Sequence, residues 1–136
     1  MNPQIVYLNI KEFEASALEE LFLSVEWSSG QYPSRLKRAI GNSDQVFSAW
    51  DGEKLVGLVN ALDDGEMTAY VHFLLIRPSY QGMGIGKALL DMIKDTYCDY
   101  LRIVLISYSE VIPFYERCGF EQSQTGAPMF LTTLLT

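Results

Sequence analysis

The sequence has few of the residues that build disulfide frameworks and metal centres. Two cysteines, Cys98 and Cys118, and one histidine occur among its 136 residues. The cysteines form no CxxC pair and have no histidine at the spacing of metal ligands, which argues against a zinc site. We expect both thiols to stay reduced in or near the core, as thiols of the cytosol usually do, and we expect no metal ion.

Basic residues are also scarce. Lysine and arginine total 10 against 17 acidic residues, which gives a formal net charge of −7. Nucleic-acid binding relies on clustered basic side chains, and the one short cluster, Arg35-Leu36-Lys37-Arg38, is typical of a solvated helix face. We therefore expect no nucleic-acid partner, and the acidic balance favours cationic substrates such as amines.

Long apolar runs are absent as well. None approaches the roughly 18 residues that span a bilayer, and residues 1–7 lack the basic segment and apolar run of a secretion signal. We expect no membrane partner and a cytoplasmic location. With 49% hydrophobic and 20% charged residues, the chain fits a single globular domain over residues 1–136.

The hydrophobic periodicity predicts strands and helices interleaved along the chain. The predicted strands span residues 5–10, 45–50, 54–62, 67–76, 101–107 and 129–134. The predicted helices span residues 15–27, 34–41, 84–97 and 111–118, with Ser34 as the cap of the second. This order predicts an α+β (α/β) single domain. Within the predicted strand 67–76, side chains alternate between the two faces of the strand. One face carries Thr68, Tyr70, His72, Leu74 and Ile76. The other face is apolar and is expected in the core; it carries Ala69, Val71, Phe73 and Leu75.

A glycine-rich segment, Gly82-Met83-Gly84-Ile85-Gly86, lies between a predicted strand and a predicted helix. Glycines let the backbone approach a ligand, and free amides at a helix start bind phosphate groups. The Walker A spacing fails, because Gly82 to Gly86-Lys87 is one residue short and Ala88 follows. The dinucleotide spacing fails too, because Lys87 or Leu89 stands where the third glycine is needed.

Two segments together carry a family resemblance. Gln81-Gly82-Met83-Gly84-Ile85-Gly86 fits Gln/Arg-x-x-Gly-x-Gly/Ala, and Tyr115-Glu116-Arg117-Cys118-Gly119-Phe120 fits Tyr-Glu-(Lys/Arg)-x-Gly-Phe. In their order and spacing they resemble the hallmarks of the GCN5-related N-acetyltransferase (GNAT) superfamily. The resemblance implies a mixed central sheet of about six or seven strands flanked by about four helices, with acetyl-CoA as cosubstrate.

The resemblance also implies where acetyl-CoA binds. The strand before the glycine-rich segment is expected to carry a bulge that splays it from the next strand, and main-chain groups of Leu74 and Ile76 would bind the pantetheine arm. The Ile76 amide would also stabilise the oxyanion of the reaction. The cofactor-binding loop implied for the pyrophosphate consists of Gln81, Gly82, Met83, Gly84, Ile85, Gly86 and Lys87. The Lys87 side chain could add charge there or be a solvated helix residue.

Two residues are the catalytic candidates. Tyr115 falls on the family's tyrosine that gives a proton or a hydrogen bond to the CoA thiolate. His72, with Tyr70 near it, resembles the histidine pair of arylalkylamine acetyltransferases; it could be the general base or a hydrogen-bonded structural residue. The glutamate of histone-type members is absent, because Tyr70 stands there. The family's asparagine before the second segment is also absent, and Ser107 or Ser109 could replace it.

We predict an acetyl-CoA-dependent N-acetyltransferase that works by direct attack of a primary amine. The predicted acceptor is a small molecule, and the alternatives are a protein or peptide amine and a non-catalytic acetyl-CoA sensor. Trp27, Tyr32 and Trp50 could line an aromatic amine pocket or pack in the core. The apolar segment 129–131 could contribute a sheet edge to a homodimer.

Overall fold

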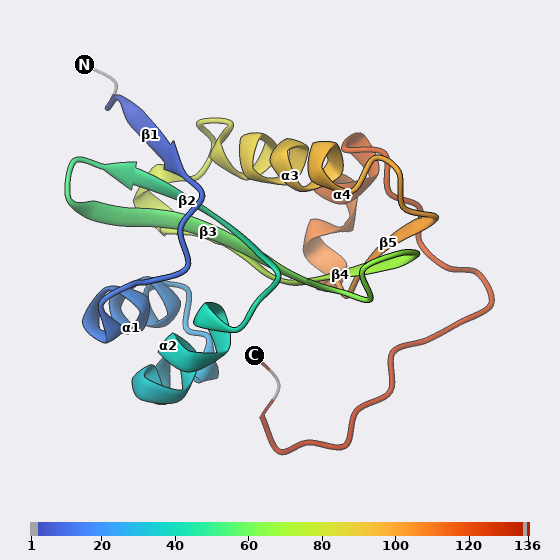
Figure 1. Ribbon diagram of the computed structural model, residues 1–136, viewed down its shortest axis with the longest axis horizontal. Coiled ribbons are helices and arrows are strands. Elements are labelled where there is room, and N and C mark those ends of the chain that lie inside the picture. Colours follow the sequence, from blue (N-terminus) through green and yellow to red (C-terminus); the bar gives the residue numbers. More distant parts are fainter. Residues whose placement is uncertain (1–2, 135) are drawn as a thin grey trace.

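The computed structural model describes residues 3–134 and 136. A central sheet carries helices on both of its faces (Figure 1), which confirms the predicted α+β class. The strands are β1 (Ile5–Leu8), β2 (Gln45–Asp51), β3 (Lys54–Asp63), β4 (Thr68–Ile76) and β5 (Arg102–Leu105). The helices are α1 (Ala15–Ser24), α2 (Pro33–Gly41), α3 (Ile85–Thr96) and α4 (Ile112–Arg117). Short 3-10 turns are η1 (Ser28–Gln31), η2 (Pro78–Tyr80) and η3 (Ser109–Val111).

The sheet is mixed, as expected. Its order is β1-β2-β3-β4-β5; the first four strands pair antiparallel, and β5 runs parallel to β4. Helices α1 and α2 lie between β1 and β2, whereas tight turns join β2 to β3 and β3 to β4. Gly52, with a φ of 61°, allows the turn from β2 into β3. A parallel pair needs a longer crossover, and α3 provides it between β4 and β5 (Figure 1).

Two apolar clusters fill the two faces of the sheet. On one face α1 and α2 pack through residues such as Phe22 and Ile40, and the Phe22 ring meets Phe73 of β4 edge-to-face at 4.9 Å. On the other face α3 packs through Leu89 and Ile93. Figure 1 shows the same arrangement, with α1 and α2 on one side of the sheet and α3 on the other. Burial of these faces is the main force that holds the helices to the sheet.

The predicted strand at residues 129–134 is wrong, and the described residues contain five strands rather than six or seven. An apolar segment becomes a strand only if a neighbour pairs with its main-chain groups. Here the chain after α4 swings away from the sheet and returns toward α1 and α2 (Figure 1). A homodimer formed through this segment stays a prediction.

Helix boundaries differ from the prediction for local reasons. Helix α1 ends at Ser24, whose hydroxyl donates to the Leu21 carbonyl at 2.6 Å, and not at Trp27. Helix α2 begins at Pro33 without a side-chain cap from Ser34, because the fixed φ of proline suits the first helical position. The helix predicted at 111–118 is α4, one residue shorter at each end, because Val111 belongs to the separate turn η3 and Cys118 follows the last helical residue.

The cysteines, the possible metal ligands and the possible membrane helices can be placed in the structure. Cys118 is buried and Cys98 is exposed, so the expected burial holds for one thiol only, and both are free. In the described part of the chain, no group of three or more His, Cys, Asp or Glu side chains is placed to hold a metal ion. Over the same residues, no helix combines the length and the apolar character needed to cross a membrane.

Candidate functional site

Strand β4 has one residue more than β3 over the stretch where the two strands pair, and that residue is His72. Phe73 lies opposite Asn60, whereas Val71 already lies opposite the next residue of β3, Ala61. The Phe73 amide donates to the Asn60 side-chain oxygen at 2.9 Å. Such a β-bulge bends the strand and increases its twist. The bulge expected on this strand is therefore confirmed.

The bulge changes which faces of the sheet the β4 side chains occupy. Val71 packs in the cluster that faces α3, whereas Phe73 and Leu75 pack in the cluster that faces α1 and α2. The single shared face predicted for these residues is wrong, because one extra residue reverses the alternation. As a result His72 lies beside both aromatic neighbours, with ring centroids 3.8 Å from Phe73 and 5.6 Å from Tyr70.

A gap opens between β4 and β5 beyond the bulge. The two strands pair only from Thr68 to Val71 on β4. Beyond Val71, no described strand pairs with β4 on the β5 side, although β3 continues to pair on the other. A groove follows this gap, and its lining includes His72, Leu74, Ile76 and, from α4, Tyr115. The structure thus brings both catalytic candidates and both predicted strand residues into one groove.

The main-chain groups of Leu74 and Ile76 face this groove. The amides of Phe73 and Arg77 donate toward β3, to Asn60 and to the Val56 carbonyl at 2.8 Å. Because successive amides of a strand point in opposite directions, those of Leu74 and Ile76 point to the open side.

The Gln81 side chain marks the same direction at the end of the strand. Its amide nitrogen donates to the Ile76 carbonyl at 3.0 Å. A residue's carbonyl and amide lie on the same side of a strand, so this bond places both main-chain groups of Ile76 toward the glycine-rich loop. Gln81 lines the groove and also ties the loop to the strand end.

The glycine-rich loop presents a row of free main-chain donors to the groove. Gly82 and Gly84 have φ values of 80° and 82°, in the left-handed region that favours glycine. Among the described residues, the amides of 82–87 have no main-chain acceptor; the first helical bond runs from the Ala88 amide to the Gly84 carbonyl at 3.0 Å. Free amides at the start of the 12-residue helix α3, with its dipole behind them, fit an anionic phosphate.

Two members of the predicted loop have further contacts. Met83 lies outside the groove and borders a shallow depression with Tyr80 and Lys54. Lys87 lines the groove, but its ammonium forms an ion pair with Asp91 at 2.7 Å. The hydrogen bond to Asp91 raises the pKa of Lys87 and keeps it cationic. Lys87 therefore has an exposed ionic partner on its own helix.

Gly57 of β3 supports the site from behind, and the sequence pattern did not predict this role. A Cβ atom at Gly57 would stand 2.9 Å from the Ile76 side chain and 3.2 Å from Ile85. Glycine at this position lets the strand end and the start of α3 approach each other closely. The available signal was a glycine inside a predicted strand, which often marks a close approach of neighbouring groups.

Tyr115 reaches the groove from α4. Its ring packs edge-on against Phe114 and Phe120, at centroid distances of 5.1 and 6.0 Å. Burial, with a smaller contribution from Cys118, raises the pKa of Tyr115 to about 12. The phenol therefore stays protonated at neutral pH and can donate its proton.

His72 stands in the part of the groove that is walled by aromatic side chains. Trp27 lies 6.3 Å from Tyr108 and 6.0 Å from Phe73, measured between ring centroids, and all three line the groove with Tyr70. Partial loss of solvent lowers the pKa of His72 below its usual value. The imidazole is therefore mainly neutral at pH 7 and can accept a proton.

The other two predicted pocket aromatics lie elsewhere. The Trp50 ring stacks on Phe13 at 6.1 Å, and its indole donates to Ser48 at 2.9 Å. Tyr32 is 47% exposed and does not line the groove. Of the three candidates, only Trp27 belongs to the site.

The serines suggested in place of the family's asparagine differ in position. Ser107 lines the groove, and its hydroxyl donates to the Tyr108 carbonyl at 2.8 Å. Ser109 begins η3 and does not line the groove. Ser107 is therefore the serine that is placed to contact a ligand in the groove.

Comparison with known proteins assigns the family. A family model described as an acetyltransferase (GNAT) domain matches residues 14–129. The chain belongs to the GNAT acetyltransferase family. An uncharacterized N-acetyltransferase ycf52-like from Prochlorococcus marinus is 29% identical over 127 residues, which cover 89% of this chain and 70% of that protein. Histone acetyltransferase TAP1 from Glycine max is 29% identical over 136 residues, which cover 90% of this chain and 58% of that relative.

Solved structures show the same GNAT fold. A GNAT-family acetyltransferase from Streptococcus pneumoniae TIGR4 matches with a TM-score of 0.82 at 23% identity, over 96% of this chain and 99% of the other. A probable acetyltransferase from meticillin-resistant Staphylococcus aureus matches with a TM-score of 0.86 at 15% identity, over 95% and 99%. At these identities the likeness shows the fold alone.

Proposed function

We propose that this GNAT domain transfers an acetyl group from acetyl-CoA to a primary amine of a small molecule. One observation carries the proposal: Leu74 and Ile76, with their open main-chain groups, and residues 82 and 84–87, with their free amides, line a single groove. A row of strand groups followed by a phosphate-binding helix start suits a ligand with an amide-bearing arm and a diphosphate. Acetyl-CoA has both parts and supplies an activated acetyl thioester.

Main-chain amides hold the ligand, and no charged side chain of the loop is needed. The amides of residues 82–87 bind the diphosphate oxygens, and the positive φ of Gly82 and Gly84 keeps the loop open around them. The amides of Leu74 and Ile76 bind the arm. The Ile76 amide, nearest the loop, is fixed because Gln81 holds the carbonyl of the same residue.

His72 and Tyr115 move the protons. A primary amine is protonated at neutral pH and must lose a proton before it can attack. The neutral imidazole of His72 accepts that proton, and the lowered pKa keeps it available above about pH 6.5. The Tyr115 phenol, still protonated because burial raises its pKa to about 12, donates to the leaving sulfur.

The walls of the groove favour a small acceptor with an apolar body. Trp27, Tyr70 and Tyr108 surround His72, and Glu110 is the one acidic residue among the lining residues. A polycationic acceptor would need several carboxylates, whereas an aromatic or aliphatic monoamine fits these rings. Histone acetyltransferase TAP1 is named for a protein substrate, so a peptide amine is the competing acceptor.

The test is acetyl transfer by the purified chain, followed as release of free CoA thiol. Phenethylamine, putrescine and a lysine-containing peptide are offered separately with acetyl-CoA. Faster release with phenethylamine or putrescine than with the peptide supports a small-molecule acceptor, and preference for phenethylamine over the dication putrescine supports an acceptor with an apolar body. Preferred use of the peptide would assign a protein acceptor. Binding of acetyl-CoA by calorimetry without thiol release for any amine would assign a sensor.

A further inference from the structure

Helix α4 carries Tyr115 but has little of its own to hold it in place. It spans six residues, all within the described part of the chain, and none of the six is buried or belongs to either apolar cluster of the sheet. A helix this short is not stable alone in water. Figure 1 shows α4 beside the end of α3 that leads into β5. Contacts at the ends of α4 must therefore keep the Tyr115 ring in the groove.

The C-terminal end of α4 is built around the main chain of Tyr115. The Phe120 amide donates to the Tyr115 carbonyl at 3.0 Å, and the Gly119 amide donates to the next carbonyl, also at 3.0 Å. This pair of bonds ends a helix with a residue in the left-handed region, here Gly119 with a φ of 97°. The same motif commonly packs the following residue against the helix, and the Phe120 ring meets the Tyr115 ring edge-on at 6.0 Å. Gly119 and Phe120 therefore hold both the main chain and the ring of Tyr115.

Lys94 of α3 binds the same end of α4 from the neighbouring helix. Its ammonium donates at 2.6 Å to the carbonyl of Cys118, the residue that caps α4. The last carbonyls of a helix lack partners within it and carry the negative end of its dipole, so a lysine there satisfies one carbonyl and adds a favourable charge interaction. Among the described residues Lys94 forms no ion pair, unlike Lys87, which pairs with Asp91 of its own helix. The Lys94 ammonium is therefore bound to α4.

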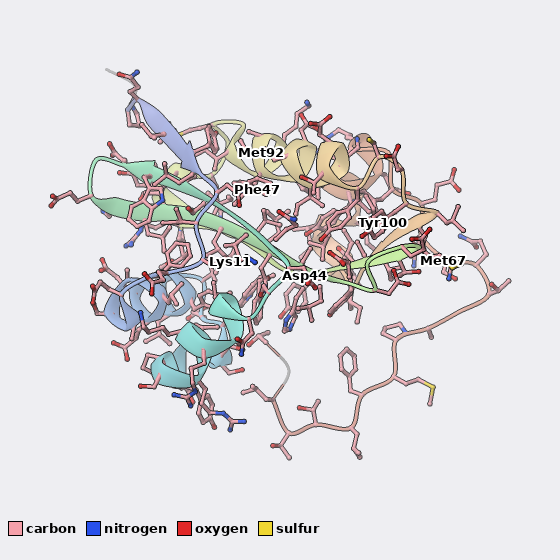
Figure 2. The ribbon with its side chains drawn as sticks, in the orientation of Figure 1. Lys11, Asp44, Phe47, Met67, Met92 and Tyr100 are labelled. Atoms are coloured by element: carbon pink, nitrogen blue, oxygen red, sulfur yellow. The ribbon has the colours of Figure 1, made fainter. Side chains whose placement is uncertain are left out.

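The contacts between α3 and α4 lie on one flank of α3. Met92, labelled in Figure 2, packs against the sheet cluster from the other flank. At about 100° per residue, Lys94 lies about 200° further round the helix than Met92. Near the start of the same helix, a Cβ atom at Gly86 would lie 3.4 Å from the Phe114 ring, so this ring packs against the glycine backbone. Helix α4 is thus held on both sides of Tyr115, by Phe114 before it and by the Lys94 bond after it.

We propose that Lys94 is a positioning residue of the acetyl transfer: through the Cys118 carbonyl it holds the C-terminal end of α4, so that the Tyr115 phenol stays in the groove beside the leaving sulfur. The proposal rests on the proposed function for the step that Tyr115 serves. Lys94 is not among the residues that line the groove, so it acts through α4 and not by contact with a ligand.

The first test measures the opening of α4 and needs no catalysis. Hydrogen exchange of the Gly119 and Phe120 amides, followed by NMR on the full chain, reports this opening because both amides are bonded at the end of the helix. Lys94→Met removes the charged donor, and we expect both amides to exchange at least fivefold faster than in the wild type. Lys94→Arg keeps a cationic donor and should stay within twofold of the wild-type rate. Wild-type exchange in Lys94→Met would overturn the anchoring of α4 by Lys94.

The second test uses acetyl transfer to phenethylamine. Lys94→Met should lower kcat at least fivefold and leave the KM for the amine within twofold, whereas Lys94→Arg should retain at least half of the wild-type kcat. Lys11→Met is the matched control, because Lys11 is an exposed lysine between β1 and α1 (Figure 2), and it should keep the wild-type kcat. Wild-type kcat in Lys94→Met, together with faster exchange of the α4 amides, would overturn the positioning role.

A double-mutant cycle separates positioning from a general loss of structure. In the Tyr115→Phe background, Lys94→Met should lower kcat less than twofold further, because the phenol that it positions is already gone. The same fivefold loss in both backgrounds would overturn the positioning of Tyr115 and assign Lys94 a structural role. Faster amide exchange in Lys94→Met without thiol release by the wild type would overturn the proposed function and support the anchoring of α4.

Discussion

The Phe73 amide donates to the buried side-chain oxygen of Asn60 at 2.9 Å, at the point where His72 interrupts the pairing of β3 and β4. The other end of the Asn60 amide donates to the Ser43 hydroxyl at 3.0 Å. That hydroxyl in turn donates to the Ala39 carbonyl of α2. One buried side chain therefore fixes the bulge that opens the groove and connects it to a helix.

Replacing Asn60 by alanine should destabilise the fold and weaken the groove. The Phe73 amide would lose its acceptor, and an unsatisfied buried amide costs about 1–3 kcal/mol. Urea unfolding should show this loss, and calorimetry should show weaker binding of acetyl-CoA. Asn9→Ala changes an exposed asparagine in a loop and should leave both quantities unchanged. Wild-type stability of Asn60→Ala would show that the bulge does not depend on this bond.

Tyr115→Phe should reduce kcat at least tenfold, about 1.4 kcal/mol in the barrier. The substitution removes the proton donor and keeps the ring that packs against Phe114 and Phe120. The Kd of acetyl-CoA, measured by calorimetry, should change little. Tyr32→Phe is the matched control, because Tyr32 is exposed and lies outside the groove. Wild-type kcat in Tyr115→Phe would remove the phenol from the mechanism.

The pH dependence of kcat/KM should carry the signature of His72. Desolvation lowers its pKa from 6.5, so the imidazole is protonated and inactive as a base only below that value. The rate should therefore fall as pH decreases through a midpoint below 6.5. We expect His72→Gln to remove this acid limb and to lower the rate on the plateau. An unchanged acid limb in the variant would assign the titration to another group.

Gly84→Ala should weaken acetyl-CoA binding about tenfold, or about 1.4 kcal/mol. The φ of Gly84 is 82°, which costs a residue with a Cβ atom about 1–2 kcal/mol. No protein atom lies within 4 Å of the added Cβ, so the loss would come from backbone strain and from crowding of the free amides. Calorimetry gives the Kd, and thermal unfolding gives the stability.

Gly41→Ala is the control for that substitution. Gly41 closes α2 without a positive φ, and an added Cβ would meet the Lys11 carbonyl at an ordinary 3.8 Å. It should leave acetyl-CoA binding unchanged. Equal Kd values for Gly84→Ala and the wild type would contradict the role of the loop in binding the diphosphate.

The sequence by itself determined the features that depend on local chemistry. Alternating glycines before a helical repeat indicate free amides at a helix start, because positive φ and unbonded donors are properties of a few adjacent residues. The Tyr115 segment and the order of strands and helices were readable for the same reason. These features suffice to locate the loop and the fold class.

The tertiary structure decided what depends on contacts between distant residues. The faces of β4 could not be read from alternation, because Asn60, 13 residues before Phe73, accepts from the Phe73 amide and stabilises the extra residue at His72. Trp27 and Tyr108 meet only because the turn after α1 and the segment after β5 reach the same end of the groove. Residues 129–134 had the pattern of a strand, but none of the described strands pairs with them, and Thr136 bonds to Ser28, 108 residues away. Strand pairing and packing are set by the whole fold, so the aromatic end of the groove was decided by the tertiary structure.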